Sequence, residues 1–399
     1  MAVSDVHHLL VIGIDTTFIA SSAKSAGYNV YAVDYFDDVD LQWTCDDYES
    51  AVRYHQGIGP PFDPHILLET AKTLMARHPV DAVLLSSGLD DYVDVLFELD
   101  SMASILGNPP DVIRNVRMKP KFFNELKTLG IPYPETAVVE NMFEAKEAAD
   151  KIGYPVVLKP AASFGGMGIR IASNSLEVEH AFSVASKITG TVIIQKLVKG
   201  FHASMSILAT RNNVKVLSIN EQLLGLSSVF QSEPFGYCGN VVPLQVTEPI
   251  FRKCELIAKK IVSHFGLKGS NGIDIVISED GTPYVIEVNP RFQGTLGCVE
   301  RTLRINLVDA HVKACLCNEL PTLKHFSNFC TRLILYAPKR VVVPNLTIFK
   351  DVRNIPPPQS VIEKGEPICS VLAEGETREA SFQKADYLAR TIYGRLRPF

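Results

Sequence analysis

The chain has 399 residues, of which 46% are hydrophobic and 21% are charged, and its formal net charge is -5. This length exceeds that of a typical single domain, so two to four compact units are expected, and the composition gives no sign of disorder. The small negative charge comes without a block of like charges. It therefore argues against a nucleic-acid or membrane surface and favours small-molecule substrates.

The eight cysteines are scattered, and the only close pair is Cys315 and Cys317. That spacing fits neither a zinc knuckle nor a redox motif, so buried, reduced thiols are expected. The N-terminus has no basic stretch before its short apolar run, and no later segment reaches about 18 uninterrupted apolar residues. A cytoplasmic protein is therefore expected, and the sequence leaves open whether it forms a homodimer.

The first part of the chain predicts a parallel α/β domain. An apolar run at 9–14 is followed by a helical pattern and a second apolar run at 28–36, and another strand is expected at 80–87. Gly13 lies at the end of the first strand, but the full dinucleotide fingerprint is missing, so a dinucleotide site is disfavoured. A Pro- and Gly-rich stretch at 106–115 ends this domain.

From residue 116 the pattern changes to an α+β arrangement that continues to about residue 330. An acidic turn with glycine at 279–281 predicts a hairpin between the last two strands. Residues 331–399 contain too little apolar sequence for a separate core and are expected to cap the preceding body. The expected helices are 116–130, 143–152 and 176–189, and the expected strands are 155–160, 169–173, 192–198, 203–210, 214–220, 272–278 and 283–289.

Three glycines lie in the loop 163–168 between two strand patterns. Their backbone N–H groups can wrap an anion without obstruction, and phosphate is the natural ligand, although many hairpins use glycines only for turns. A P-loop would run into a helix and end in Gly-Lys-Ser or Gly-Lys-Thr, so that class is excluded. Lys159 ends the preceding strand, where its ammonium group is either solvated or placed to neutralise phosphate charge.

Three oxygen-bearing side chains are expected on the hairpin. Glu287 and Asn289 lie two apart and share a sheet face, and Asp274 lies on the partner strand, so the set suits Mg²⁺. An unpaired Glu287 in this apolar strand would cost on the order of several kcal/mol, so a cation or Arg291 must compensate it. Arg291 follows Pro290 and is expected either to face developing negative charge or to form a surface ion pair.

In this order the residues resemble the ATP-grasp superfamily over about residues 1–330. The resemblance implies an N-terminal parallel α/β pre-ATP-grasp domain at 1–115 and an ATP-grasp domain at 116–330, followed by the cap at 331–399. Within the second domain it implies a small lid subdomain at about 150–200 and a subdomain built on an antiparallel sheet. Segments 26–41, 220–225 and 237–244 look like archaeal ATP-grasp proteins described as predicted carboligases related to biotin carboxylase.

The same resemblance implies roles for individual residues. Lys119 is matched to a nucleotide lysine, with Lys121 as the alternative, and Gln195 replaces the usual acid of the adenine hinge. His202 stands where many relatives carry an acid that meets the ribose, although a packed or surface histidine is the alternative. The implied cofactor-binding residues are Lys119, Lys159, Ser163, Gly165, Gly166, Met167, Gly168, Gln195, Lys196, Leu197, Val198 and His202, the metal ligands are Asp274, Glu287 and Asn289, and the catalytic residues are Lys159 and Arg291.

The implied activity is that of an ATP-dependent ligase that uses ATP with Mg²⁺ or Mn²⁺. It would activate a carboxylate as an acyl phosphate for attack by an amine or a similar nucleophile, with release of ADP and phosphate. A carboxylase that phosphorylates bicarbonate and a non-catalytic nucleotide sensor are the alternatives. The substrate pocket is expected between the N-terminal domain, 220–240 and 291–300, with Glu221 and Asn240 as candidate contacts.

Overall fold

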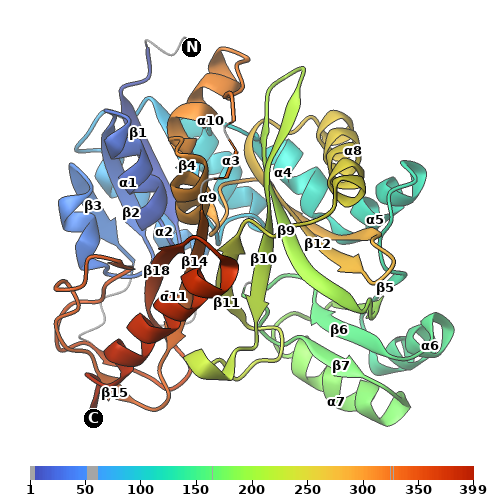
Figure 1. Ribbon diagram of the computed structural model, residues 1–399. Helices are drawn as coiled ribbons and strands as arrows, with labels where there is room; N and C mark the ends of the chain where they lie inside the picture. Colours follow the sequence, from blue (N-terminus) through green and yellow to red (C-terminus); the bar gives the residue numbers. More distant parts are fainter. Residues whose placement is uncertain (1–4, 52–61, 164, 324, 327) are drawn as a thin grey trace.

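The computed structural model describes residues 5–51, 62–163, 165–323, 325–326 and 328–399. These residues form a parallel sheet of four strands, antiparallel sheets of four and eight strands, and a small three-stranded sheet (Figure 1). No helix in the described part of the chain is both long and apolar enough to cross a membrane. The eight cysteines are unpaired, and most are buried as expected, but Cys317 is exposed.

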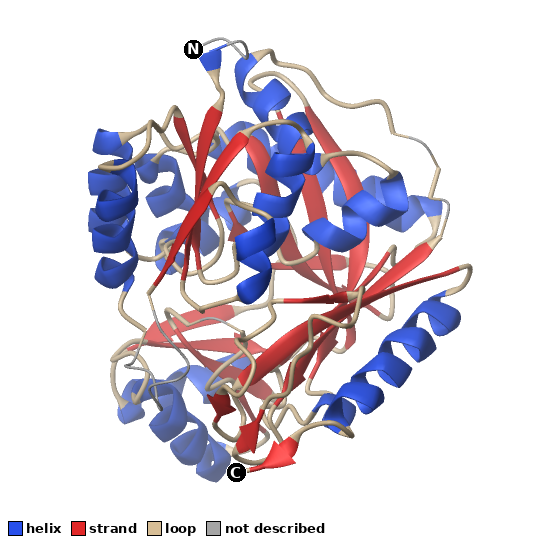
Figure 2. Ribbon diagram, turned by 90° about the vertical axis from the view of Figure 1, so that its left-hand side faces the viewer, coloured by secondary structure: helices blue, strands red, loops and turns tan. Residues whose placement is uncertain are grey.

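The N-terminal part is the expected parallel α/β unit. Its strand order is β3-β2-β1-β4, and every pairing within it is parallel. Leu9 to Ile12 of β1 are completely buried because helices cover both faces of the sheet, as Figure 2 shows. The strands are β1 (His8–Gly13), β2 (Asn29–Asp34), β3 (Asp47–Ser50) and β4 (Ala82–Leu85), and the helices are α1 (Thr17–Ser25), α2 (Pro64–Met75) and α3 (Val93–Met102).

The predicted helix at 116–130 is present but shorter, and a second helix precedes it, mostly within the stretch 106–115, where none was predicted. Helix α4 (Pro110–Arg117) ends before Met118, and α5 (Lys119–Thr128) starts directly after it. Pro120 explains the break, because a proline ring inside a helix clashes with the carbonyl four residues earlier and removes a backbone donor. The break leaves Arg117 and Lys119 two residues apart at the junction of the two helices.

The lid is a four-stranded antiparallel sheet with the order β5-β8-β6-β7. Two helices pack together on it, and each begins with an asparagine, Asn141 or Asn174, whose side chain accepts a backbone N–H of the first turn. Figure 1 shows this unit at the lower right of the molecule. Its strands are β5 (Thr136–Val139), β6 (Val156–Pro160), β7 (Arg170–Ala172) and β8 (Val192–Lys196), and its helices are α6 (Met142–Ile152) and α7 (Ser175–Ser186).

The central element is an eight-stranded antiparallel sheet with the order β13-β12-β9-β10-β11-β14-β18-β16. The last three strands in this order come from the final 71 residues, so that part of the chain extends the sheet directly. Strand β11 was not among the predicted strands. The strands are β9 (Gly200–Ala209), β10 (Val214–Leu224), β11 (Tyr237–Val242), β12 (Gly269–Ser278), β13 (Pro283–Asn289), β14 (Phe329–Tyr336), β16 (Val352–Arg353) and β18 (Pro367–Gly375).

Four helices and a small sheet complete the body. Helix α8 packs on β9, β10 and β13, while α9 and α10 share one apolar cluster with α1 and so join the N-terminal unit to the central sheet. Helix α11 covers β14 and β18. The bounds are α8 (Glu248–Phe265), α9 (Leu296–Leu303), α10 (Leu307–Leu316), α11 (Arg378–Tyr393), β15 (Val341–Val342), β17 (Val361–Ile362) and β19 (Arg397–Pro398).

The packing of α5 on the central sheet can be tested with two phenylalanines. Phe122 is completely buried in the apolar cluster below β9 and β12, whereas Phe143 on α6 is 77% exposed. Phe122→Ala should lower the free energy of unfolding by roughly 3–5 kcal/mol, because it leaves a cavity, and Phe143→Ala should change it by less than about 1 kcal/mol. Urea unfolding measures both, and similar losses in the two variants would contradict the described packing.

Candidate active site

The hairpin β12–β13 brings three oxygen-bearing side chains together. Asp274 and Glu287 are direct partners across the two strands, with a bulge directly after Asp274. Asn289 lies two residues beyond Glu287 and donates its Nδ2 hydrogen to Asp274 Oδ2 at 3.1 Å. Gln222 of β10, which the sequence did not single out, donates to Asp274 Oδ1 at 3.0 Å. The convergence expected from the spacing is therefore present, whereas a metal role stays a prediction.

Two cations from the α4–α5 break contact Glu287. Lys119 Nζ lies 3.0 Å from Glu287 Oε2, and Arg117 lies 3.5 Å from the same oxygen. Lys119 is 8% exposed, whereas Lys121 is exposed and bonds Asn115, so the geometry favours Lys119 over its alternative. Burial would raise the pKa of Glu287, but Lys119, Arg117 and Lys159 together lower it below its ordinary value. Glu287 is therefore an ionised carboxylate.

Arg117 is a site residue that sequence reasoning missed. Besides contacting Glu287, it donates to both carboxylate oxygens of Asp91, at 2.8 and 2.7 Å, and its side chain is only 8% exposed. Its position two residues before Lys119 was the available signal. The partner Asp91 follows β4 in the N-terminal unit, and no local pattern connects it to the hairpin.

The sequence predicted that either a cation or Arg291 compensates the charge of Glu287. The second option is wrong, because Arg291 pairs with Asp90 instead. Its Nε donates to Asp90 Oδ2 at 2.7 Å, and its NH2 group lies 3.5 Å from Asn289 Oδ1. The side chain is 14% exposed, so this is an inner ion pair and not a surface one. Asp90 and Asp91, at the carboxyl end of the parallel sheet, therefore each hold one arginine of the site.

Opposing effects act on the pKa of Asp274. Burial and the nearby Glu287 carboxylate raise the pKa of Asp274 to about 7, while the Asn289 hydrogen bond and Arg291 oppose that rise. Two carboxylates this close repel each other, and a divalent cation between them would remove the repulsion. The described residues contain no cluster of three or more His, Cys, Asp or Glu side chains that could hold a metal, so a site here needs the Asn289 oxygen as well.

Lys159 faces the same group of charges from the lid. Burial, and then the charge of Lys119, lower the pKa of Lys159 to about 8, and Glu287 and Asp274 oppose this shift. Its ammonium group donates to Gln195 Oε1 at 3.1 Å, and Gln195 donates in turn to Thr136 Oγ1 at 2.8 Å. Gln195, which stands where the ATP-grasp resemblance implies an acid, thus binds Lys159 through a buried amide and adds no charge.

Two of the three hinge residues after Gln195 form hydrogen bonds within the protein. The Lys196 ammonium donates to the carbonyls of Gly153 and Tyr154 at 2.8 and 3.0 Å. The backbone N–H of Lys196 donates to Glu135 O, and that of Leu197 donates to Pro155 O. In this conformation neither of these N–H groups can donate to an adenine base. A contact between the Val198 backbone and the base stays a prediction.

The glycine loop folds back on the segment before β11. Gly165, Gly166 and Gly168 have φ values of +65°, +78° and +75°, in the left-handed region that favours glycine. The Gly165 carbonyl accepts the Tyr237 N–H at 3.0 Å. Of the other predicted residues, Ser163 is partly buried, Met167 is 49% exposed, and His202 packs its ring against Phe235 with burial lowering its pKa.

The candidate substrate contacts have different surroundings. Glu221 is tied to Arg378 of α11 by two hydrogen bonds of 2.9 and 2.6 Å. Asn240 is completely buried and donates to Tyr237 Oη at 2.7 Å, while its side-chain oxygen has no hydrogen-bond partner among the residues that the structure describes. Of the two, Asn240 retains an unused polar atom.

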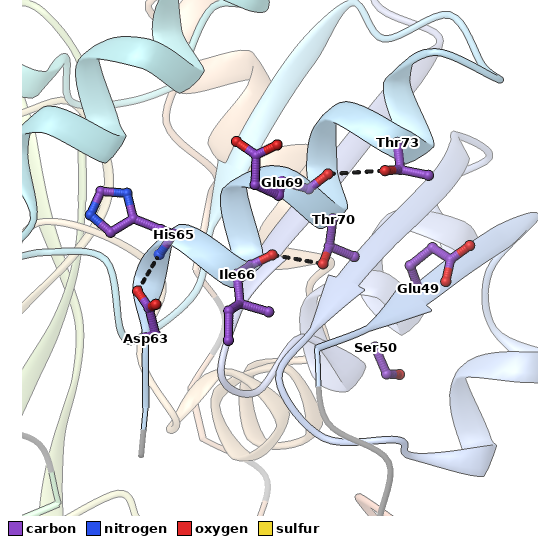
Figure 3. Close-up of a pocket in the computed structure, with 8 residues that line it drawn as sticks. All are labelled: Glu49, Ser50, Asp63, His65, Ile66, Glu69, Thr70 and Thr73. Atoms are coloured by element: carbon purple, nitrogen blue, oxygen red, sulfur yellow. Dashed lines mark hydrogen bonds between the residues drawn. The ribbon is translucent and has the colours of Figure 1, made fainter. Parts of the chain in front are cut away.

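A surface pocket of about 510 Å³ lies elsewhere, between β3 and α2 of the N-terminal unit (Figure 3). The described residues that line it include three acids and no lysine or arginine, so these side chains do not suit a phosphate. It is lined by Glu49, Ser50, Asp63, His65, Ile66, Glu69, Thr70 and Thr73.

One family model and several known proteins are similar to this chain. Residues 116–295 match the ATP-grasp domain family, and the chain has the ATP-grasp fold. The fold class predicted from the sequence is thereby confirmed. An uncharacterized protein of Methanocaldococcus jannaschii is 27% identical over 92% of this chain and 88% of its own length. The arginine-specific carbamoyl phosphate synthase large chain of Schizosaccharomyces pombe is 27% identical over 78% of this chain, which spans only 27% of that relative.

Two solved structures show the same fold across the whole chain. The biotin carboxylase domain dimer of the Hydrogenobacter thermophilus 2-oxoglutarate carboxylase, in complex with MgADP, ADP and bicarbonate, has a TM-score of 0.75 and 18% identity over 98% of this chain and 90% of that chain. The L-amino acid ligase of Bacillus licheniformis has a TM-score of 0.71 and 17% identity over 98% of each chain. At this level of identity the two matches show that the chain shares their fold.

The buried charge of Lys159 predicts a pH-dependent stability difference. Its pKa is about 8 in the folded protein against an ordinary 10.5, so the cost of burying its charge is present in full below about pH 8 and disappears above about pH 10.5. Lys159→Met should therefore stabilise the protein at pH 7, by at most about 3 kcal/mol, and the gain should shrink as the pH rises. Thermal unfolding at several pH values, with the exposed Lys127→Met as control, measures this. Destabilisation at pH 7 would contradict the account.

Proposed function

We propose that the chain is an ATP-dependent ligase that phosphorylates a substrate carboxylate and passes the acyl group to an amine or similar nucleophile. The observation that carries the proposal is the meeting of Asp274, Glu287 and Asn289 with the lysines of two other elements, Lys119 of α5 and Lys159 of β6. Oxygen ligands beside lysines suit a divalent cation bound to a triphosphate.

The two lysines and the glycine loop 163–168, called the glycine flap from here on, would hold the phosphates of ATP. In the free protein Lys119 neutralises Glu287 at 3.0 Å, so binding of a cation at Glu287 would release the ammonium group for a phosphate oxygen. Mg²⁺ would supply charge neutralisation between the carboxylates and the phosphates. Asp274, Glu287 and Asn289 would be its protein ligands, and water and phosphate would complete its shell.

The reaction would proceed in two displacements. A carboxylate oxygen of the substrate attacks the γ-phosphorus of ATP, the bond to the β-phosphate oxygen breaks, and ADP leaves. The nucleophile then attacks the carbonyl carbon of the acyl phosphate and forms a bond to it, the bond from that carbon to the phosphate oxygen breaks, and inorganic phosphate leaves together with the proton that an amine nucleophile gives up. Arg291, fixed by Asp90 at 2.7 Å, would stabilise the negative charge that develops in both steps.

A carboxylase that phosphorylates bicarbonate is the second candidate. The match to a biotin carboxylase domain solved with bicarbonate and the similarity to carbamoyl phosphate synthase support it. A non-catalytic sensor is less favoured, because the set of Asp274, Glu287, Asn289 and Arg291 is complete. A dimer is also proposed, on the likeness to that domain dimer, and light scattering would measure it.

The enzymatic proposal is tested with Mg²⁺, ATP and pools of carboxylic acids, amino acids and other amines. At least one pool should raise ADP release and give a new amide mass, and Glu287→Gln should reduce the rate at least about 100-fold because charge stabilisation is lost. Glu279→Gln, the same change at an exposed position of the same hairpin, should keep the wild-type rate. ADP release that requires bicarbonate would favour the carboxylase, and no response to any pool would contradict both enzymatic proposals.

Nucleotide binding should be coupled to proton uptake. Lys159 has a pKa of about 8 in the free protein, and phosphate contacts would raise it, so at about pH 9 binding should take up close to one proton. At about pH 6.5 the lysine is already charged, and this uptake should vanish. Calorimetric titration in buffers of different ionisation enthalpy measures the protons, and Lys159→Arg should abolish the uptake at pH 9. Equal uptake by the wild type and this variant would refute the role given to Lys159.

A further inference from the structure

One carboxylate connects the glycine flap to the body of the protein. Glu233, in the connection between β10 and β11, binds Arg170 through two oxygens, with Oε2 to NH1 at 2.5 Å and Oε1 to NH2 at 3.0 Å. Glu233 Oε2 also accepts the Gly168 N–H at 3.4 Å. Arg170 is the first residue of β7, two positions after the flap ends, so Glu233 holds both the end of the flap and the strand that follows it.

The flap also docks on this segment through its backbone. Tyr237 N–H donates to the Gly165 carbonyl, and a Cβ atom on Gly166 would lie only 1.9 Å from the Phe235 carbonyl oxygen. The contact is therefore backbone against backbone, which only glycine permits at that position. A loop of glycines has few side chains that could hold it in one position. The carboxylate of Glu233 holds it through its bonds to Gly168 and Arg170, and Glu233 is therefore called the anchor of the flap.

The anchor belongs to the central sheet and not to the lid. Tyr336 of β14 donates its hydroxyl hydrogen to the Tyr237 carbonyl at 2.6 Å, and the rings of Phe235 and His202 of β9 form a T-shaped contact with their centroids 5.9 Å apart. The bond between Glu233 and Arg170 therefore spans the lid and the body. Both side chains are partly exposed, at 30% and 25%, so the pair can open and close in water.

We propose that Glu233 is a positioning residue that holds the glycine flap closed over the phosphate site and so sets how long the nucleotide stays bound. This inference rests on the proposed function, because it takes the flap as the cover of a bound nucleotide. The carboxylate does not touch the reacting atoms. It acts through Arg170 and Gly168, and loops of this kind commonly control release from closed active sites.

Removing the charge of Glu233 tests the anchor in two ways. Glu233→Gln should speed hydrogen exchange of the amides at 165–168 in the nucleotide-free protein about fivefold, and should speed dissociation of a Mg²⁺-bound non-hydrolysable ATP analogue by a similar factor. The charge-exchanged double variant Glu233→Arg with Arg170→Glu should restore both rates toward wild type. Glu179→Gln is the matched control, because it breaks the ion pair with Lys146 inside the same lid and should change neither rate.

The outcomes separate this inference from the proposed function. Wild-type exchange at 165–168 in Glu233→Gln would overturn the anchor, and so would equal acceleration in Glu179→Gln, which would indicate general loosening of the lid. A wild type that binds no Mg²⁺-nucleotide would contradict the proposed function, while exchange in the nucleotide-free protein would still decide whether Glu233 holds the flap.

Two glycine variants give an independent test of the docked flap. Gly165 and Gly166 both have positive φ, so alanine is strained at either, but only at Gly166 would its Cβ meet the Phe235 carbonyl, whereas nothing lies within 4 Å at Gly165. Gly166→Ala should therefore speed exchange of the neighbouring flap amides several-fold more than Gly165→Ala. Equal effects in the two variants would overturn the docking of the flap on this segment.

Discussion

The pairing of Asp274 with Glu287 across one hairpin is the constraint on which the site depends. Two carboxylates held side by side in a largely buried sheet repel each other, so the fold has to bring positive charge to them. Lys119 and Arg117, which flank the break between α4 and α5, supply this charge. They lie 3.0 Å and 3.5 Å from Glu287 Oε2. The same arrangement leaves Asp274 with a pKa of about 7, a carboxyl that a cation would readily keep ionised.

The site joins parts of the chain that are far apart in sequence. Asp90 and Asp91 of the N-terminal unit fix Arg291 and Arg117, so the parallel sheet determines how the arginines sit beside the hairpin. The lid contributes Lys159 through β6 and the flap that follows it. An ATP-dependent reaction in this protein would therefore need the N-terminal unit as a structural part of the site, and not only as a neighbour.

Sequence reasoning succeeded where the information is local. Alternation and the turn at 279–281 predicted the hairpin, and the spacing of two residues predicted that Glu287 and Asn289 share a face. It failed where partners are distant, because no local pattern connects Asp91 to Arg117 or Glu233 to the flap. Local apolarity likewise could not show that the final strands extend the central sheet, since that depends on long-range pairing between β11 and β14.

The side chains of the hairpin are proposed to hold a divalent cation together with a nucleotide. Electron paramagnetic resonance of Mn²⁺ tests it directly, because bound and free Mn²⁺ have different spectra. ATP should create a tight Mn²⁺ site on the wild-type protein, and this site should be lost in Glu287→Gln but kept in Glu279→Gln. Equal Mn²⁺ binding with ATP by the wild type and Glu287→Gln would contradict it.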